Sequence, residues 1–344
     1  MFAVIDCGTT NTRVYILNDK QETIGVGTRK VGVRNTSMTG SKDTLRQGVC
    51  EAILEAVESA GIALSQLDFA IASGMITSEI GLMEIPHLIA PVGLEDLATS
   101  VKVVPAGEIL PLDIPILFIR GIRNDYGEAI LQNIRHVDFM RGEETQVMGI
   151  LDEFKIDEAV NIIVLSSHTK LIHINAQGQI TASLTTISGQ LYEAVCKETM
   201  IGKSLIRDDS ESAGGYSFEE VVRIANEVTQ EVGLDRSMLI PRFMQVLLKT
   251  DYKERNLFID AAIAADDMRL IAEFERQGHF AQKYILFGHA SRCKIYAYLL
   301  EKHCPKDTEI VSVSDPNRLA QLTVRGAMRI ATRYQETHEH KNQR

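Results

Sequence analysis

The chain has 344 residues, of which 45% are hydrophobic and 24% are charged, and its formal net charge is −10. This length exceeds what one ordinary hydrophobic core organises, so we expect two domains. Acidic and basic residues are interspersed along the chain. Nucleic acid is therefore excluded as the main partner, because binding to a phosphate backbone requires a basic face.

Neither a membrane span nor a signal peptide is expected. The sequence contains no run of 18 or more apolar residues, and it opens on the strand-like residues 2–5 without a charged segment before an apolar one. The five cysteines are scattered and form no Cys-x-x-Cys pair. Reduced thiols and a cytoplasmic location are the simplest interpretation.

The first part of the chain is predicted to alternate strands and helices. Three strands in succession are expected at residues 3–5, 14–17 and 23–29, followed by a helix over 45–57. Further strands are expected at 69–72 and 116–119, and a helix at 143–151 with acids in its first turn. Residues 85–115 are rich in proline and short apolar runs, which indicates an irregular lobe.

The second part repeats this opening. Strands are expected at 162–165, 171–174 and 180–184, helices at 218–232, 239–249 and 256–274, and strands at 284–287 and 309–313. A last helix can pack back on the first domain. Two halves that each open with three strands joined by tight turns predict a duplicated α/β unit, whereas a Rossmann fold would begin with a βαβ pattern.

The first turn, residues 6–11 (DCGTTN), is crowded with small and hydroxylated residues. Glycine lets backbone N–H groups approach an anion, and hydroxyl groups add hydrogen-bond donors. An aspartate at the end of a strand can orient a hydrated divalent cation. The same residues also suit an ordinary hairpin turn, and local chemistry does not decide between the two.

Three further segments carry candidate chemistry. Residues 140–146 (MRGEETQ) place Glu143 and Glu144 at a helix start, where they are either solvated residues that favour the helix dipole or a base that accepts a proton from a substrate hydroxyl. Residues 166–170 (SSHTK) form a second hydroxylated turn, and residues 288–291 (GHAS) join a strand to a helix. Taken alone, a plain turn is the simpler interpretation of each.

Two glycine-containing segments are excluded as phosphate motifs. Gly202-Lys203-Ser204 resembles the end of a P-loop, but the earlier glycine that this loop requires falls on Lys197. Gly25-Val26-Gly27 resembles a dinucleotide fingerprint, but its third glycine falls on Lys30.

In this order, the four candidate segments resemble the actin/hexokinase/glycerol-kinase superfamily and, within it, the 2-dehydro-3-deoxygalactonokinase family. The family's DWGTTNLR, GMVGS, MRGEETQ and GTHSKW correspond here to residues 6–13 (DCGTTNTR), 74–78 (GMITS), 140–146 (MRGEETQ, matched throughout) and 166–171 (SSHTKL). The resemblance implies an α/β fold of two actin/hexokinase (ribonuclease H-like) domains, residues 1–152 and 153–344, with a nucleotide cleft between them.

The resemblance also implies an ATP-dependent kinase that phosphorylates a hydroxyl of a 2-keto-3-deoxy sugar acid such as 2-dehydro-3-deoxy-galactonate. In it, Asp6 holds Mg²⁺ through water, Glu143 is the catalytic base, and Glu144 is the second choice. The nucleotide is bound by Gly8, Thr9, Thr10, Asn11, Ser167, His168, Thr169, Lys170, Gly288, His289, Ala290 and Ser291. The substrate is bound by Arg34, Gly74, Met75, Ser78 and Arg141.

The chain departs from the family pattern at several positions. Cys7 and Leu171 replace tryptophans, Ser166 replaces a glycine of the second turn, and Gln190 stands where the family has a glutamate. Two alternatives therefore stay open: a kinase of another sugar acid or polyol, and a catalytically weak ligand-binding sensor of the same fold. The stereochemistry of the substrate, the hydroxyl phosphorylated and a homodimeric state are also left open.

Overall fold

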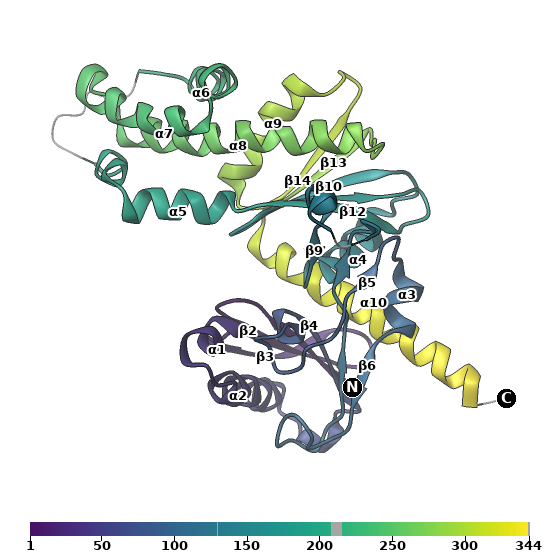
Figure 1. The fold of residues 1–344 in the computed structure, drawn as a ribbon. Helices are drawn as coiled ribbons and strands as arrows, with labels where there is room; N and C mark the ends of the chain where they lie inside the picture. Colours follow the sequence, from purple (N-terminus) through teal and green to yellow (C-terminus); the bar gives the residue numbers. More distant parts are fainter. Residues whose placement is uncertain (129, 208–214, 343–344) are drawn as a thin grey trace. The chain divides into compact units, whose positions relative to one another are not determined.

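The computed structural model of the protein describes residues 1–128, 130–207 and 215–342 (Figure 1). Its internal contacts divide the chain into two compact units. Unit 1 comprises Met1–Glu158, Ile174–Ser183 and Ala320–Arg344, and unit 2 comprises Ala159–His173 and Leu184–Leu319. The domain boundary expected between residues 152 and 153 stays a prediction.

A six-stranded sheet, ordered β3-β2-β1-β4-β7-β6, forms the centre of unit 1. Its strands are β1 (Phe2–Cys7), β2 (Thr12–Leu17), β3 (Thr23–Arg29), β4 (Phe69–Gly74), β6 (Lys102–Val104) and β7 (Ile116–Phe118). β1 pairs antiparallel with β2 and parallel with β4, and the parallel register aligns Cys7 with Gly74. The loops that follow β1 and β4 therefore leave the sheet at the same edge.

Helix α2 (Asp43–Ala60) packs closely on β3, and glycines make this contact possible (Figure 1). A Cβ atom at Gly27 would lie 2.0 Å from the carbonyl oxygen of Ala52, and one at Gly25 would lie 2.3 Å from that of Ala56. Both glycines are thus required by helix packing. The apolar faces of β1, β2 and α2 meet in a fully buried core that includes Ile5, Ile16 and Ile53.

The remainder of unit 1 is built from short elements around α4 (Glu143–Phe154). They are the helices α1 (Val33–Thr39) and α3 (Leu94–Thr99), the strands β5 (Leu88–Ile89), β8 (Ile122–Arg123) and β9 (Phe139–Met140), and the 3₁₀ turns Leu64–Gln66, Met75–Thr77 and Leu131–His136. The segment 85–115, expected to be irregular, contributes β5, α3 and β6. Its short strands pair with β8 and β7, so their partners lie outside the segment.

The last helix, α10 (Pro316–Asn342), contacts α4 inside unit 1. A Cβ atom at Gly149 would lie 1.9 Å from the carbonyl oxygen of Leu322, and one at Gly326 would lie 1.8 Å from that of Thr145. The two helix backbones therefore meet directly through their glycines.

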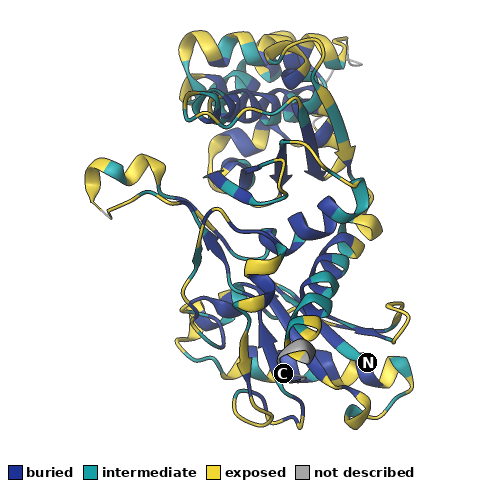
Figure 2. Cartoon of the chain, turned by 90° about the vertical axis from the view of Figure 1, so that its right-hand side faces the viewer, coloured by how far each residue is buried: buried dark blue, intermediate teal, exposed yellow. Residues whose placement is uncertain are grey.

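The second sheet is ordered β12-β11-β10-β13-β14. Its strands are β10 (Val160–Leu165), β11 (Thr169–Ile174), β12 (Ile180–Thr186), β13 (Lys283–Gly288) and β14 (Glu309–Val313). Three successive strands followed by a parallel partner repeat the arrangement of the first sheet. β10 and β11 are buried along their whole length. Figure 2 colours buried residues dark blue. The expected duplicated α/β unit is confirmed.

Helices dominate the rest of unit 2: α5 (Ser188–Glu198), α6 (Phe218–Val232), α7 (Leu234–Phe243), α8 (Tyr252–Arg276) and α9 (Ala290–His303), with a 3₁₀ helix at Met200–Ser204 and a π-helical turn at Met244–Leu248. The expected helix 239–249 was displaced, because α7 starts at Leu234 and gives way to the π-helical turn after Phe243. Across the described ranges, no helix is both long and apolar enough to cross a bilayer.

Candidate active site

The first candidate phosphate turn joins β1 to β2 in unit 1. The N–H group of Gly8 donates to the carbonyl oxygen of Asn11 at 2.9 Å, which closes the turn. Thr9 and Thr10 are exposed, and within the described part of the chain their backbone N–H groups have no hydrogen-bond partner. The turn thus presents unused backbone donors to solvent, which is the arrangement that binds anions.

The segment from Gly32 to Arg34 packs against this turn and is hydrogen-bonded to it. The N–H groups of Val33 and Arg34 donate to the carbonyl oxygens of Gly8 (3.2 Å) and Thr9 (2.9 Å). A Cβ atom at Gly32 would lie 2.5 Å from the Thr9 oxygen, so only glycine fits there. This support was not predicted from the sequence, where Gly32 is its one visible signal.

Asp6 is the second-to-last residue of β1 and lies beside the turn, with its carboxylate 3.8 Å from the guanidinium of Arg13 on the paired strand. Burial raises the pKa of Asp6, and the charge of Arg13 partly opposes this shift. The described residues contain no cluster of three or more metal-ligating side chains. A single carboxylate fits Mg²⁺, which keeps most of its waters and is held by one or two carboxylates together with substrate phosphates.

The start of α4 brings the acid pair to the same edge of the first sheet. Gly142 precedes the helix with φ at 111°, in the left-handed region. A Cβ atom there would lie 3.3 Å from Cα of Gly74, which ends β4 opposite Cys7. The candidate base, the loop after β4 and the first phosphate turn are therefore neighbours within unit 1.

The two glutamates differ in environment. Glu144 is buried, and its carboxylate oxygens accept the N–H group of Gly142 at 2.9 and 2.8 Å. Burial, reinforced by the negative charge of Glu143, raises the pKa of Glu144 to about 7. Glu143 is half-buried and accepts the N–H group of Arg141 at 3.2 Å. Of the pair, Glu143 is the carboxylate that solvent and substrate can reach.

The candidate substrate residues fall into two groups. Arg141 donates to Thr77 Oγ1 at 2.8 Å and to the carbonyl oxygen of Ile85 at 2.7 Å, and Ser78 Oγ donates to the Met75 carbonyl at 2.7 Å. These side chains shape the loop after Gly74. Arg34 is exposed beside the first turn. The substrate-binding role of these residues stays a prediction.

The second candidate turn connects β10 to β11 in unit 2. Both the N–H group and Oγ of Ser166 donate to the carbonyl oxygen of His168, at 3.0 and 3.2 Å, and Ser167 Oγ lies 3.1 Å from His168 Nδ1. Among the described residues other than glycine, only Gln21, Lys155 and Lys249 have positive φ. Ser166 therefore replaces the family's glycine without backbone strain.

Two other segments of unit 2 flank this turn. Lys170 lies buried in β11 and donates to Thr185 Oγ1 at 2.6 Å, so its ammonium is engaged along the sheet. The start of α5 packs against the turn: a Cβ atom at Gly189 would lie 2.2 Å from the Ser166 carbonyl oxygen. The N–H group of Gln190 donates to the Ser167 carbonyl at 2.8 Å.

The small-residue turn after β13 lies at the same edge of the second sheet. β10 and β13 are parallel, with Leu165 aligned to Gly288. A Cβ atom at Gly288 would lie 2.5 Å from the Leu165 carbonyl oxygen, so glycine is required. His289 caps α9 by accepting the N–H group of Ser291 on Nδ1 at 3.4 Å, and both residues are exposed. Unit 2 thus brings the second turn and this one together.

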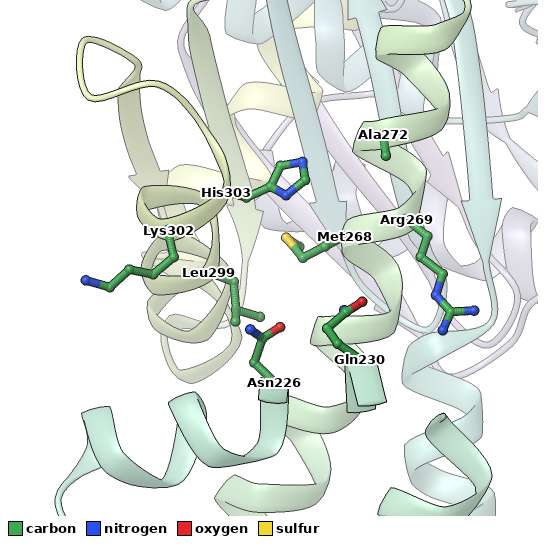
Figure 3. A pocket seen from close by; sticks show the side chains of 8 residues that line it. All are labelled: Asn226, Gln230, Met268, Arg269, Ala272, Leu299, Lys302 and His303. Carbon is green, nitrogen blue, oxygen red and sulfur yellow. The ribbon is translucent and has the colours of Figure 1, made fainter. Parts of the chain in front are cut away.

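A pocket of about 340 Å³ between α6, α8 and α9 contains none of the predicted site residues (Figure 3). It is lined by Asn226, Gln230, Met268, Arg269, Ala272, Leu299, Lys302 and His303. Arg269 and Lys302 extend away from its middle (Figure 3), Arg269 pairs with Asp266, and Lys302 lies over the ring of Tyr298. Its cations are thus directed elsewhere, and it is distinct from the site predicted by the sequence.

Comparison with solved structures confirms the fold. The chain is similar to a crystal structure of a Sinorhizobium meliloti protein assigned as a 2-dehydro-3-deoxygalactonokinase, with a TM-score of 0.71 and 19% identity over 97% of this chain and 98% of that one. It is also similar to a reductive activator for a corrinoid, iron–sulfur protein, with a TM-score of 0.52 and 12% identity over 97% of this chain and 62% of that one. At these identities the likeness concerns the fold alone.

Comparison by sequence identifies the family. The chain is 22% identical over 226 residues to a Rhizobium meliloti (strain 1021) protein named probable 2-dehydro-3-deoxygalactonokinase, and the match spans 66% of this chain and 66% of the relative, just under two thirds. The model of the 2-keto-3-deoxy-galactonokinase family matches residues 6–315. This range contains all four motif segments on which the resemblance was based. The chain therefore belongs to the 2-keto-3-deoxy-galactonokinase family, a family of carbohydrate kinases whose phosphoryl acceptor is an alcohol group.

Proposed function

We propose that this protein transfers the γ-phosphoryl group of Mg·ATP to a hydroxyl of a 2-keto-3-deoxy sugar acid such as 2-dehydro-3-deoxy-galactonate. One observation carries the proposal. In unit 1, the unused donors of Thr9 and Thr10, the carboxylate of Asp6 and the start of α4 with Glu143 lie at one edge of one sheet. Family membership and the names of the relatives support this acceptor class.

The chemistry requires positioning and charge neutralisation more than covalent catalysis. The backbone N–H groups of Thr9 and Thr10 would bind phosphate oxygens. Asp6 would orient the water shell of Mg²⁺, which when bound neutralises charge on the phosphates. In unit 2, the exposed Ser167 and His289 lie in turns that share a sheet edge, and these turns would bind the phosphates and the adenosine.

Glu143 would accept the proton of the acceptor hydroxyl, because it is the accessible carboxylate of the pair. Glu144 is buried with both oxygens on the N–H group of Gly142, so it would fix the start of the helix that carries Glu143. Arg141 would hold the loop after Gly74 in place through its hydrogen bonds to Thr77 and Ile85.

The alternative of a weakly catalytic sensor had two motivations, Ser166 and Gln190. The backbone of Ser166 is unstrained. Gln190 supports the second turn through its backbone N–H group and exposes its side chain. Ser166 therefore gives no backbone reason for lost activity, and turnover tests whether the carboxylate absent at Gln190 is needed.

An ADP-release assay over a panel of keto-deoxy sugar acids, other sugar acids and polyols tests the proposal. We expect turnover with a keto-deoxy acid, and a loss of about 10²–10⁴-fold in kcat for Glu143→Gln. Glu219→Gln, which changes an exposed acid in the first turn of α6, is the matched control and should leave kcat within about twofold. Turnover with a polyol alone would reject the acceptor class, and a Glu143→Gln rate within a few-fold of wild type would reject the base.

A further inference from the structure

We propose that Arg292, Tyr296 and Asp267 form a buried positioning network for the second phosphate turn, residues 166–169, so that Arg292 sets the affinity for ATP without contacting it. The inference builds on the proposed function, because it takes this turn to bind the nucleotide phosphates. Every residue of the network belongs to unit 2.

Arg292 holds the turn at both ends. Its Nη1 donates to the Ser166 carbonyl oxygen at 2.9 Å, and its Nη2 donates to Thr169 Oγ1 at 3.1 Å and to the Tyr296 hydroxyl at 3.2 Å. Arg292 lies in the first turn of α9, directly after the 288–291 segment. One guanidinium therefore joins the two turns to which we assign the phosphates and the adenosine.

Tyr296 connects Arg292 to the buried carboxylate of Asp267. The Tyr296 side chain is 1% exposed, and its hydroxyl donates to Asp267 Oδ2 at 2.5 Å and lies 3.2 Å from Thr169 Oγ1. Burial and the charge of Asp267 hold the pKa of Tyr296 well above its ordinary value, so the hydroxyl keeps its proton and remains a donor.

Asp267 also anchors the opposite side of the turn. It is 4% exposed and accepts Ser188 Oγ at 2.7 Å and Thr186 Oγ1 at 2.8 Å. Ser188 begins α5, whose next two residues pack on the Ser166 carbonyl and donate to the Ser167 carbonyl. The two helices that contact the turn, α5 and α9, are therefore both hydrogen-bonded to the carboxylate of Asp267.

The network depends on the shape of arginine as well as on its charge. The Arg292 side chain is 13% exposed, and its Nε lies 3.6 Å from Oδ1 of Asp260, which balances its charge. Its Nη1 and Nη2 donate to three separate acceptors, which suits a guanidinium fork, whereas a lysine ammonium is a single point donor on a flexible stem. We therefore expect Arg292→Lys to restore little of what Arg292→Met removes.

Preorganisation gives the network a measurable effect. When the turn is already ordered, ATP binding does not have to include the entropic cost of ordering it. When the turn is loosened, this cost is added to the free energy of ATP binding, which becomes less favourable. The predicted sugar-acid residues lie in unit 1, so their affinity should not change. The expected signature is a rise in Kd and KM for ATP at an unchanged KM for the acid.

The test measures Kd for a non-hydrolysable ATP analogue and KM for both substrates in Arg292→Met, Arg292→Lys and Tyr296→Phe. We expect Kd and KM for ATP to rise about tenfold or more in both Arg292 variants, since hydrogen bonds from a charged group are lost. Tyr296→Phe, which keeps the ring and most of the volume, should raise them at least about threefold. Arg269→Met, on the exposed surface of α8, is the matched control and should match wild type.

The outcomes separate the network from the proposed function. Kd values within about twofold of wild type in all three variants, with cooperative unfolding retained, would overturn the network. If Arg292→Met fails to fold, Tyr296→Phe decides: a raised Kd supports the network and an unchanged one rejects it. A wild-type protein that does not bind the analogue refutes the proposed function, and the network as an ATP-positioning device with it.

Discussion

Replacing Gly8 by alanine tests the first phosphate turn without disturbing the fold. A Cβ atom built at Gly8 meets only the carbonyl oxygen of Asn11, at 3.7 Å, which is an ordinary van der Waals contact. Gly8 is not among the described glycines with positive φ. The free energy of unfolding should therefore change by less than about 1 kcal/mol. Under the proposed function, the added methyl group would obstruct a phosphate that approaches the turn.

The effect on nucleotide affinity should be much larger. A methyl group that keeps a phosphate oxygen from one backbone donor removes a charge-assisted hydrogen bond of about 1.5–3 kcal/mol. The Kd for ATP should then rise by about 10- to 100-fold. Titration calorimetry with an ATP analogue measures this rise, and urea unfolding of the same preparation measures stability.

Gly27→Ala provides the opposite control. A Cβ atom at Gly27 would lie 2.0 Å from the Ala52 carbonyl oxygen, so this variant should lose about 1–3 kcal/mol or more of stability. Its folded fraction should bind ATP as wild type does, because β3 lies at the sheet edge beyond β2. A Gly8→Ala protein with wild-type affinity for ATP would refute the assignment of the turn.

Three further predictions concern neighbouring residues. Burial raises the pKa of Glu144 from 4.5 to about 7, so the wild-type protein binds more protons folded than unfolded and loses stability as pH rises through this window. Glu144→Gln should remove this slope, worth about 3 kcal/mol, and equal urea midpoints across pH in both proteins would contradict the burial argument. Asp6→Asn should raise the Mg²⁺ concentration for half-maximal rate by about 10- to 100-fold in a metal titration, and an unchanged titration would remove Asp6 from the cation's shell. Gly32→Ala should lower the melting temperature and weaken ATP binding together, because its Cβ atom would lie 2.5 Å from the Thr9 carbonyl oxygen; normal affinity in a destabilised variant would show that the support and the turn are independent.

Periodicity and turn chemistry were sufficient to predict the strands of the second sheet and those of the first sheet except β6. Short apolar runs such as 162–165 are bounded by polar turns, and the structure places strand β10 there. The family also followed from sequence, because residues 140–146 match its motif throughout. These signals are local, so they can be recognised in the sequence without knowing which strands pair with each other.

What the sequence concealed depends on contacts between distant residues. The role of Arg292 is visible only once Ser166, 126 positions earlier in the chain, lies beside it. Strand β6 has three residues and forms because β7 pairs with it. Gly25 and Gly27 resembled part of a nucleotide motif, but their reason is the approach of α2. A glycine in a sequence does not reveal whether its missing side chain makes room for a ligand or for a helix.

Two glycines with left-handed backbones meet where α4 reaches the end of β4. Gly74 has φ at 93° and Gly142 has φ at 111°, and each would bring a Cβ atom against the other's segment or against Cys7. A side chain at either position would therefore be strained. Residues 75–85 are held to this junction by the side chain of Arg141 and by Ile76, Leu82 and Ile85, which are buried in the same hydrophobic core as Ile5. Under the proposed function, any redesign of this loop for another acid would therefore have to keep both glycines and these three core side chains unchanged.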